Sequence, residues 1–102
     1  MIKLIVKRTE NLREKIWGLI GKNKPQAILI KTRFGIHTFG VKFPIDVLVL
    51  DNKNRVMSIK ENLKPNKIFL WNLKYKTVIE LPSGTIKKNE IKLLDDIELK
   101  LV

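Results

Sequence analysis

The stretch Gly35–Asp51, GIHTFGVKFPIDVLVLD, decides what kind of fold this chain can adopt. In its second half, Ile45–Leu50, successive side chains point to opposite faces of a strand, and both sets are apolar apart from Asp46. A strand of this kind is expected to be buried on both faces. Because a buried charge is costly unless it is hydrogen-bonded, we expect Asp46 to have a polar partner.

His37, the only histidine, lies nine positions before Asp46 and is the candidate partner. A backbone amide or Thr38 would serve equally well. In one interpretation His37 is a general base that Asp46 orients, as in hydrolase triads. In the other, the two residues form a polar clasp that fixes the register of a strand junction. We favour the clasp, because neither a nucleophile nor a second metal ligand accompanies this histidine in the sequence.

The sequence on either side of this stretch predicts mainly short strands. Asn11 and Glu14 form a capping box that begins an early helix, and Gly21 ends it. Pro82-Ser83-Gly84 breaks a strand and precedes one helical turn over 85–90. Strands are expected at Met1–Arg8, Gln26–Thr32, Ile36–Val41, Ile45–Leu50, Arg55–Lys60, Ile68–Trp71, Thr77–Leu81 and Ile97–Val102, with Ile45–Lys60 forming a hairpin.

These elements predict an α+β fold. A chain of 102 residues suffices for one domain, 1–102, with one modest core. We expect a small β-rich domain whose mostly antiparallel sheet is rolled or barrel-like, with one N-terminal helix and one short helical turn. Rolling the sheet would also remove its exposed edges.

The chain is strongly basic, with 21 Lys and Arg against 10 Asp and Glu and a net charge of +11. Such a charge invites binding to nucleic acid. The cations are scattered, however, and most are lysine, which lacks the planar fork with which arginine grips phosphate. We therefore favour a solvated lysine coat. Among the aromatic segments, Trp71–Tyr75 (WNLKY) is the best candidate for an exposed surface.

Several classes of site are not expected. The chain has no cysteine, which excludes disulfides and thiolate sites. The carboxylates Asp51, Asp95 and Asp96 lack the spacing of metal ligands, so neither a metal nor another cofactor is predicted. No apolar run is long enough for a transmembrane helix or for the core of an export signal. We therefore expect a cytoplasmic protein without membrane contact.

The sequence resembles a small prokaryotic family known as domain of unknown function 192, or uncharacterised protein family 0127. The resemblance rests on GIHTFGVKFPIDVLVLD, VIELPSGT and the closing DDIEL, and it covers nearly the whole chain. It implies a compact β-rich domain with an early helix, and no assigned activity. Many relatives have alanine where Ser83 stands, which weakens a role for that hydroxyl as a nucleophile.

The leading functional hypothesis is a non-enzymatic binding or accessory module. It would bind a small, anionic or protein ligand in a shallow cleft. One alternative is a hydrolase or lyase that uses His37 and Asp46, and another is nonspecific nucleic-acid binding through the lysines. The residues expected to line the cleft are His37, Thr38, Phe39, Asp46, Pro82, Gly84 and Thr85.

Overall fold

The computed structural model of the chain describes residues 2–9 and 27–102. Six strands form the main sheet and two form a small second sheet. The predicted helix that begins at Asn11 lies outside the described residues. The elements are β1 (Ile2–Arg8), β2 (Ala27–Lys31), β3 (Gly35–His37), β4 (Ile45–Leu50), β5 (Val56–Leu63), β6 (Ile68–Leu70), β7 (Thr77–Pro82), α2 (Thr85–Lys88) and β8 (Ile97–Leu101).

The main sheet has the strand order β5-β4-β7-β2-β1-β8. Its first half is antiparallel, since β4 pairs with both β5 and β7, and β7 pairs with β2. In its second half β1 runs parallel to both β2 and β8. The second sheet is the antiparallel pair β3 and β6. Among the described strands, three of the five pairings in the main sheet are antiparallel, so this sheet is mostly antiparallel, as predicted.

Strand β4 is buried along its whole length, which confirms the expectation drawn from its sequence. Ile45, Val47 and Val49 belong to one hydrophobic core, whereas Leu48 and Leu50 belong to another. Alternate side chains of the strand therefore pack into two different cores, one on each face of the main sheet.

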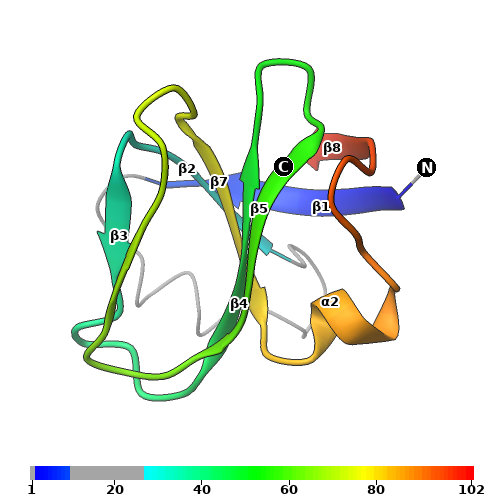
Figure 1. The fold of residues 1–102 in the computed structure, drawn as a ribbon. Helices are drawn as coiled ribbons and strands as arrows, with labels where there is room; N and C mark the ends of the chain where they lie inside the picture. Colours follow the sequence, from blue (N-terminus) through cyan, green and yellow to red (C-terminus); the bar gives the residue numbers. More distant parts are fainter. Residues whose placement is uncertain (1, 10–26) are drawn as a thin grey trace.

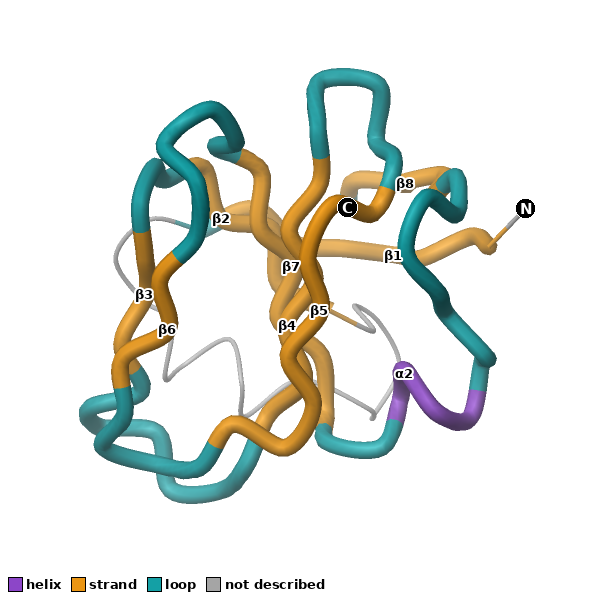
Figure 2. The backbone as a smooth tube through the Cα atoms, in the orientation of Figure 1, coloured by secondary structure: helices purple, strands orange, loops and turns teal. Residues whose placement is uncertain are grey.

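A different layer covers each of these faces. Ile36 of β3 and Trp71, which follows β6, pack into the core that contains Val47. Ile86 of α2 and Ile91, which follows it, pack into the core that contains Leu48. Figures 1 and 2 show the result, with β3 and β6 on one side of the central strands and α2 on the other. The main sheet is thus the middle layer of three.

The expectation of a barrel-like sheet is wrong, because the main sheet is not closed: β5 and β8 are its edge strands and do not pair, although an isolated bridge joins Arg55 and Asp96 beside their starts. We expected closure because it would remove the exposed edges of the sheet. In the structure the edges remain, and the two covering layers bury the faces of the central strands. The open edges carry charged side chains, including Lys60 and Glu61 on β5 and Glu98 and Lys100 on β8, which oppose edge-to-edge association.

The predicted strand Ile36–Val41 is shorter in the structure, because β3 ends at His37. The chain turns away there, and Gly40 adopts a positive φ of 87°. The other described strands lie where their sequence patterns placed them, and β5 continues past the predicted Lys60 to Leu63. The helical turn is also confirmed as α2, although it ends at Lys88 rather than Glu90.

Candidate functional site

Asp46 is fully buried, and its carboxylate accepts three hydrogen bonds from backbone N–H groups. Asn62 donates to Oδ1 at 2.9 Å, and Gly84 and Ile86 both donate to Oδ2 at 3.0 Å. These donors belong to the end of β5 and to the turn that leads into α2. Asp46 therefore ties the covering layer of α2 to the centre of the main sheet.

The turn beside Asp46 is held by further local contacts. Gly84 adopts a left-handed conformation with φ of 95°, which favours glycine, and it begins α2. The hydroxyl of Thr85 donates to the carbonyl of Pro82 at 2.7 Å. Four of the predicted cleft residues, Asp46, Pro82, Gly84 and Thr85, are thus brought together, at a junction whose donors and acceptors satisfy one another.

The expected pair of His37 and Asp46 does not form. Asp46 shares its face of β4 with Leu48, beneath the layer of α2, whereas His37 belongs to β3, which covers the opposite face. The exposed His37 ring stacks on Phe39, and its Nδ1 accepts the Phe39 N–H at 3.2 Å. The clasp at Asp46 is therefore made by backbone amides, the alternative that the sequence left open.

Thr38, the residue after β3, is buried and joins that strand to the segment before β6. Its hydroxyl donates to the carbonyl of Lys64 at 2.7 Å and accepts the N–H of Lys67 at 2.9 Å. Thr38 thus holds the second sheet together. His37, Thr38 and Phe39 therefore lie with the second sheet, apart from the junction at Asp46.

A groove of about 550 Å³ lies at the other end of β4, where sequence reasoning placed no site. The register of the sheet creates it: Thr77 at the start of β7 pairs with Lys31 at the end of β2 and with Leu50 at the end of β4. Three strands therefore reach one edge together, and the segments beyond them line the groove. The lining residues are Lys31, Arg33, Leu50, Asp51, Asn52, Asn54, Arg55, Met57, Lys74, Tyr75, Lys76 and Thr77.

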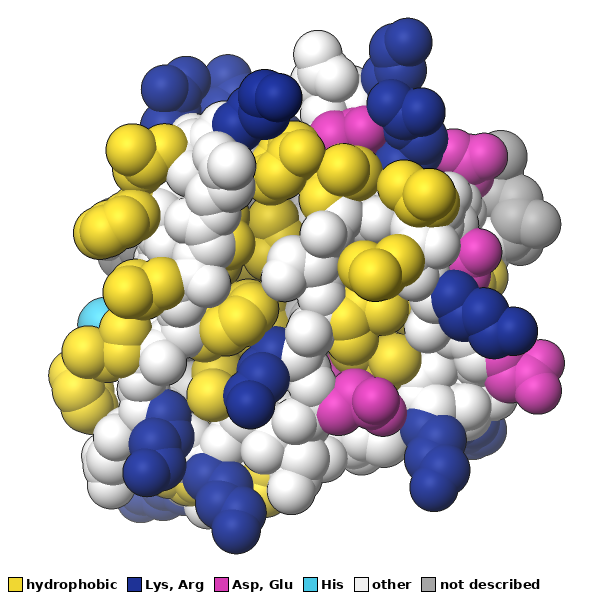
Figure 3. All heavy atoms as spheres, viewed as in Figure 1, with side chains coloured by type: hydrophobic (Ala, Val, Ile, Leu, Met, Phe, Trp, Pro, Cys, Tyr) yellow, Lys and Arg dark blue, Asp and Glu magenta, His cyan; other side chains and the backbone are white. Residues whose placement is uncertain are grey.

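Five of the residues that line the groove are basic and one is acidic. In Figure 1 the β4–β5 turn stands at the top of the molecule beside the loop between β6 and β7, and Figure 3 shows Lys and Arg side chains along this upper edge. Clustered cations in a concave site concentrate the positive potential that attracts anions. Part of the lysine coat therefore lines a concave site, where three strand ends meet.

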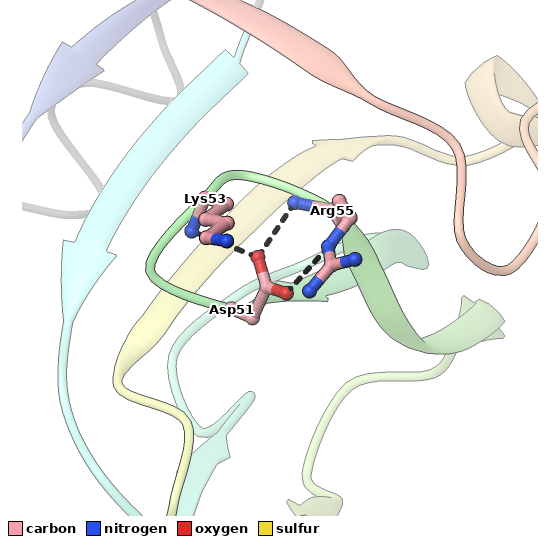
Figure 4. Close-up of polar contacts among 3 residues, drawn as sticks. All are labelled: Asp51, Lys53 and Arg55. Carbon is pink, nitrogen blue, oxygen red and sulfur yellow. Dashed lines mark hydrogen bonds and ion pairs between the residues drawn. The ribbon is translucent and has the colours of Figure 1, made fainter.

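Asp51 is the one carboxylate among the described residues of the groove, and it is hydrogen-bonded within its own turn (Figure 4). Its Oδ1 accepts the N–H groups of Lys53 and Arg55 at 2.9 and 2.8 Å, and its Oδ2 accepts Nε of Arg55 at 2.9 Å. Burial on its own raises the pKa of Asp51, but the hydrogen bonds from Arg55 and Lys53 outweigh it, so the pKa is lowered. Asp51 therefore stays ionised and fixes the Arg55 side chain.

Lys31 stands on the opposite wall, and its Nζ donates to the hydroxyl of Thr77 at 2.8 Å. Burial, together with the positive charges of Arg8 and Lys76, lowers the pKa of Lys31. Within the groove, Lys31 and Lys76 therefore repel one another.

The aromatic segment Trp71–Tyr75 is only partly the surface that its sequence suggested. Trp71 is buried, and its Nε1 donates to the carbonyl of Tyr75 at 2.8 Å. Tyr75 is half-buried and lines the groove. Among residues 2–9 and 27–102, no three His, Asp or Glu side chains gather as metal ligands would. No helix in this described part is long and apolar enough to cross a membrane.

Comparison with known proteins identifies the family of this chain. Residues 2–99 match the family model DUF192, which is described as an uncharacterised ACR. The chain belongs to the DUF192 family. This confirms the resemblance seen in the sequence, and it adds no activity. No curated protein matches this DUF192 chain.

Two solved structures share the fold of this DUF192 domain. One, a protein of unknown function from Novosphingobium aromaticivorans DSM 12444, has a TM-score of 0.64 at 19% identity, and the match covers 89% of this chain and 70% of that one. The other comes from Sinorhizobium meliloti 1021 and is described as a "putative transcription regulator". It has a TM-score of 0.70 at 19% identity, with 89% of this chain and 78% of that one covered. At this identity the likeness establishes the fold alone.

Proposed function

We propose that this DUF192 protein is a non-enzymatic binding module for a small anionic ligand, and that the groove at the end of β2, β4 and β7 is its binding site. The proposal depends on five cations that line one groove: Lys31, Arg33, Arg55, Lys74 and Lys76. Among the described residues that line it, the single carboxylate is already engaged by Arg55 and the backbone. The volume of about 550 Å³ is typical of pockets for small molecules.

The electrostatics of the groove favour an anion. Two like charges repel by about 1 kcal/mol at 4 Å in water, and by more where the surroundings are less polar. Burial lowers the pKa of Lys31 most, and the positive charges of Arg8 and of Lys76, a groove residue, lower it further. A bound anion would contact cations on both walls and offset the repulsion between them. This loss of repulsion would add to the free energy of binding.

The alternative of a hydrolase or lyase loses its geometric support, because His37 and Asp46 belong to layers on opposite faces of the main sheet. The carboxylate of Asp46 accepts three backbone N–H groups and does not orient the imidazole. Binding in the groove needs neither residue.

The proposal is tested by calorimetric titration of the protein with pyrophosphate and with citrate at low salt. Lys74→Ala/Lys76→Ala should weaken binding by about tenfold or more, because two cations leave the groove. The matched control is Lys87→Ala/Lys88→Ala, which removes the same charge from α2. When both titrations are repeated at about 0.1 M salt, its effect should stay within about twofold, because the Debye length there is about 10 Å.

Equal losses in both double variants would mean that affinity follows total charge, and the groove would then not be a site. A DNA duplex provides the test of the nucleic-acid alternative. If the duplex binds with a steep salt dependence and both pairs of lysines contribute equally, the basic surface rather than the groove is the binding element. The description of the Sinorhizobium meliloti structure makes this comparison worth including.

A further inference from the structure

Arg55 differs from the other cations that line the groove in the described part of the chain because a carboxylate holds its side chain in place. Its Nε donates to Oδ2 of Asp51 at 2.9 Å. Asp51 is itself fixed by two backbone N–H groups of the turn, and its side chain is only 9% exposed. An exposed ion pair usually adds little stability. Here, however, one partner is rigid, so the pair orients the guanidinium.

The terminal groups of Arg55 remain available for a ligand. Within the described part of the chain, its side-chain hydrogen bond and ion pair with Asp51 run through Nε, and the side chain is 48% exposed. Arginine grips phosphate through two parallel N–H groups. The bond from Nε to Asp51 therefore leaves the two Nη groups as the donors that Arg55 can offer to the groove.

The two walls of the groove carry different groups. The β4–β5 turn contributes Arg55 with the amides of Asn52 and Asn54, whereas the opposite wall contributes four cations, Lys31, Arg33, Lys74 and Lys76. A single planar carboxylate presents its two oxygens in one direction, so it faces one wall. A diphosphate carries negative oxygens around two tetrahedral centres and can face both.

We infer, resting on the proposed function, that Arg55 is the specificity-determining residue of the groove and that the ligand is a small molecule with a diphosphate or longer phosphate chain. Arg55 binds one phosphate through its Nη groups, and the four cations opposite balance the remaining charge. Asp51 is the positioning residue. Asn52, Asn54 and Tyr75 border the space left for the organic part of the ligand.

The test uses pyrophosphate, inorganic phosphate and citrate as probes, with calorimetric titration of the whole protein at low salt. Pyrophosphate should bind more tightly than either of the others. Asp51→Asn keeps an oxygen for the two backbone N–H groups but loses the acceptor for Nε. Because this variant adds positive charge to the groove, attraction by charge alone predicts tighter binding. Positioning through Arg55 instead predicts binding of pyrophosphate that is about tenfold weaker.

Arg55→Lys is the second variant, and it keeps the charge and the two backbone hydrogen bonds to Asp51 but loses the guanidinium. It should also weaken pyrophosphate binding by about tenfold, while citrate binding changes less. The inference is overturned if citrate binds more tightly than pyrophosphate, or if Arg55→Lys binds pyrophosphate like the parent protein. In those cases the proposed function still stands, provided that Lys74→Ala/Lys76→Ala weakens binding. If the parent protein binds none of the three anions, both fail.

Discussion

Asp46 and Asp51 lie at the two ends of β4, and the carboxylate of each accepts hydrogen bonds from backbone N–H groups of neighbouring segments. The outcomes differ. At Asp46 the third donor is also a backbone group, so the residue only builds structure. At Asp51 the third donor is the guanidinium of Arg55, which lines the groove, so the same device there orients a side chain for binding.

Asp46→Asn should destabilise the fold by roughly 2–4 kcal/mol, because an amide has one acceptor oxygen and presents its NH₂ to a second set of N–H donors. The loss is measured by urea denaturation. Asp96→Asn, a change of the same charge on an exposed side chain, should stay within about 0.5 kcal/mol. Equal stability of the two variants would mean that the three amides do not depend on the carboxylate.

Asp51 should make stability depend on pH. Its pKa is lowered by folding, so between the folded value and the ordinary value of 3.8 the unfolded chain binds more protons. Its contribution is therefore present above about pH 4 and is lost as the pH falls through the folded pKa. Denaturation of both proteins at several pH values measures this. The free energy of unfolding of the parent protein should exceed that of Asp51→Asn at neutral pH, and the difference should shrink as the pH is lowered. A difference that stays constant would contradict this.

The sequence predicted that Asp46 needs a partner but could not identify it. Alternation along β4 places Asp46 on the face of Leu48, and only the fold reveals that the layer of α2 covers that face. His37 was the obvious partner because it is the one histidine nearby in sequence. Its strand instead joins the layer on the other face, a choice made by its pairing with Ile68 of β6, far along the chain.

At the scale of elements, local patterns fixed most strands and missed what depends on distant contacts. The apolar run of β4 and the Gly84 turn before α2 are local signals, and both lie as expected. The early end of β3 was missed because Thr38, read as part of a strand, is instead tied to the carbonyl of Lys64, 26 residues away. A local sequence pattern cannot predict a hydrogen bond between residues so far apart in the chain.

Gly35 and Gly84 should respond differently to alanine. A Cβ at Gly35 would lie 2.9 Å from the carbonyl oxygen of Phe69, so β3 and β6 would have to separate. We expect a loss of about 1–3 kcal/mol, typical of overpacking. At Gly84 the space is open, and only the positive φ is unfavourable, at about 1 kcal/mol. Thermal denaturation compares the two, and a greater loss at Gly84 would contradict the close contact.

At the scale of the whole molecule, composition gave the net charge of +11 but not its distribution. The cations of the groove come from segments that are separate in sequence, and they meet because β7 pairs with β4 on one side and with β2 on the other. A sequence pattern can suggest the strands, but the order of strands in a mixed sheet depends on long-range pairing. For this reason the groove, unlike the buried centre, could not be foreseen.

The most direct test of the groove is an NMR titration of the parent protein, labelled with ¹⁵N, with pyrophosphate at low salt. We expect saturable shifts of backbone amide signals from 31–33, 51–57 and 74–77, with little change at Lys87 and Lys88 of α2. Shifts that do not saturate, or that are as large at α2 as in the groove, would contradict it.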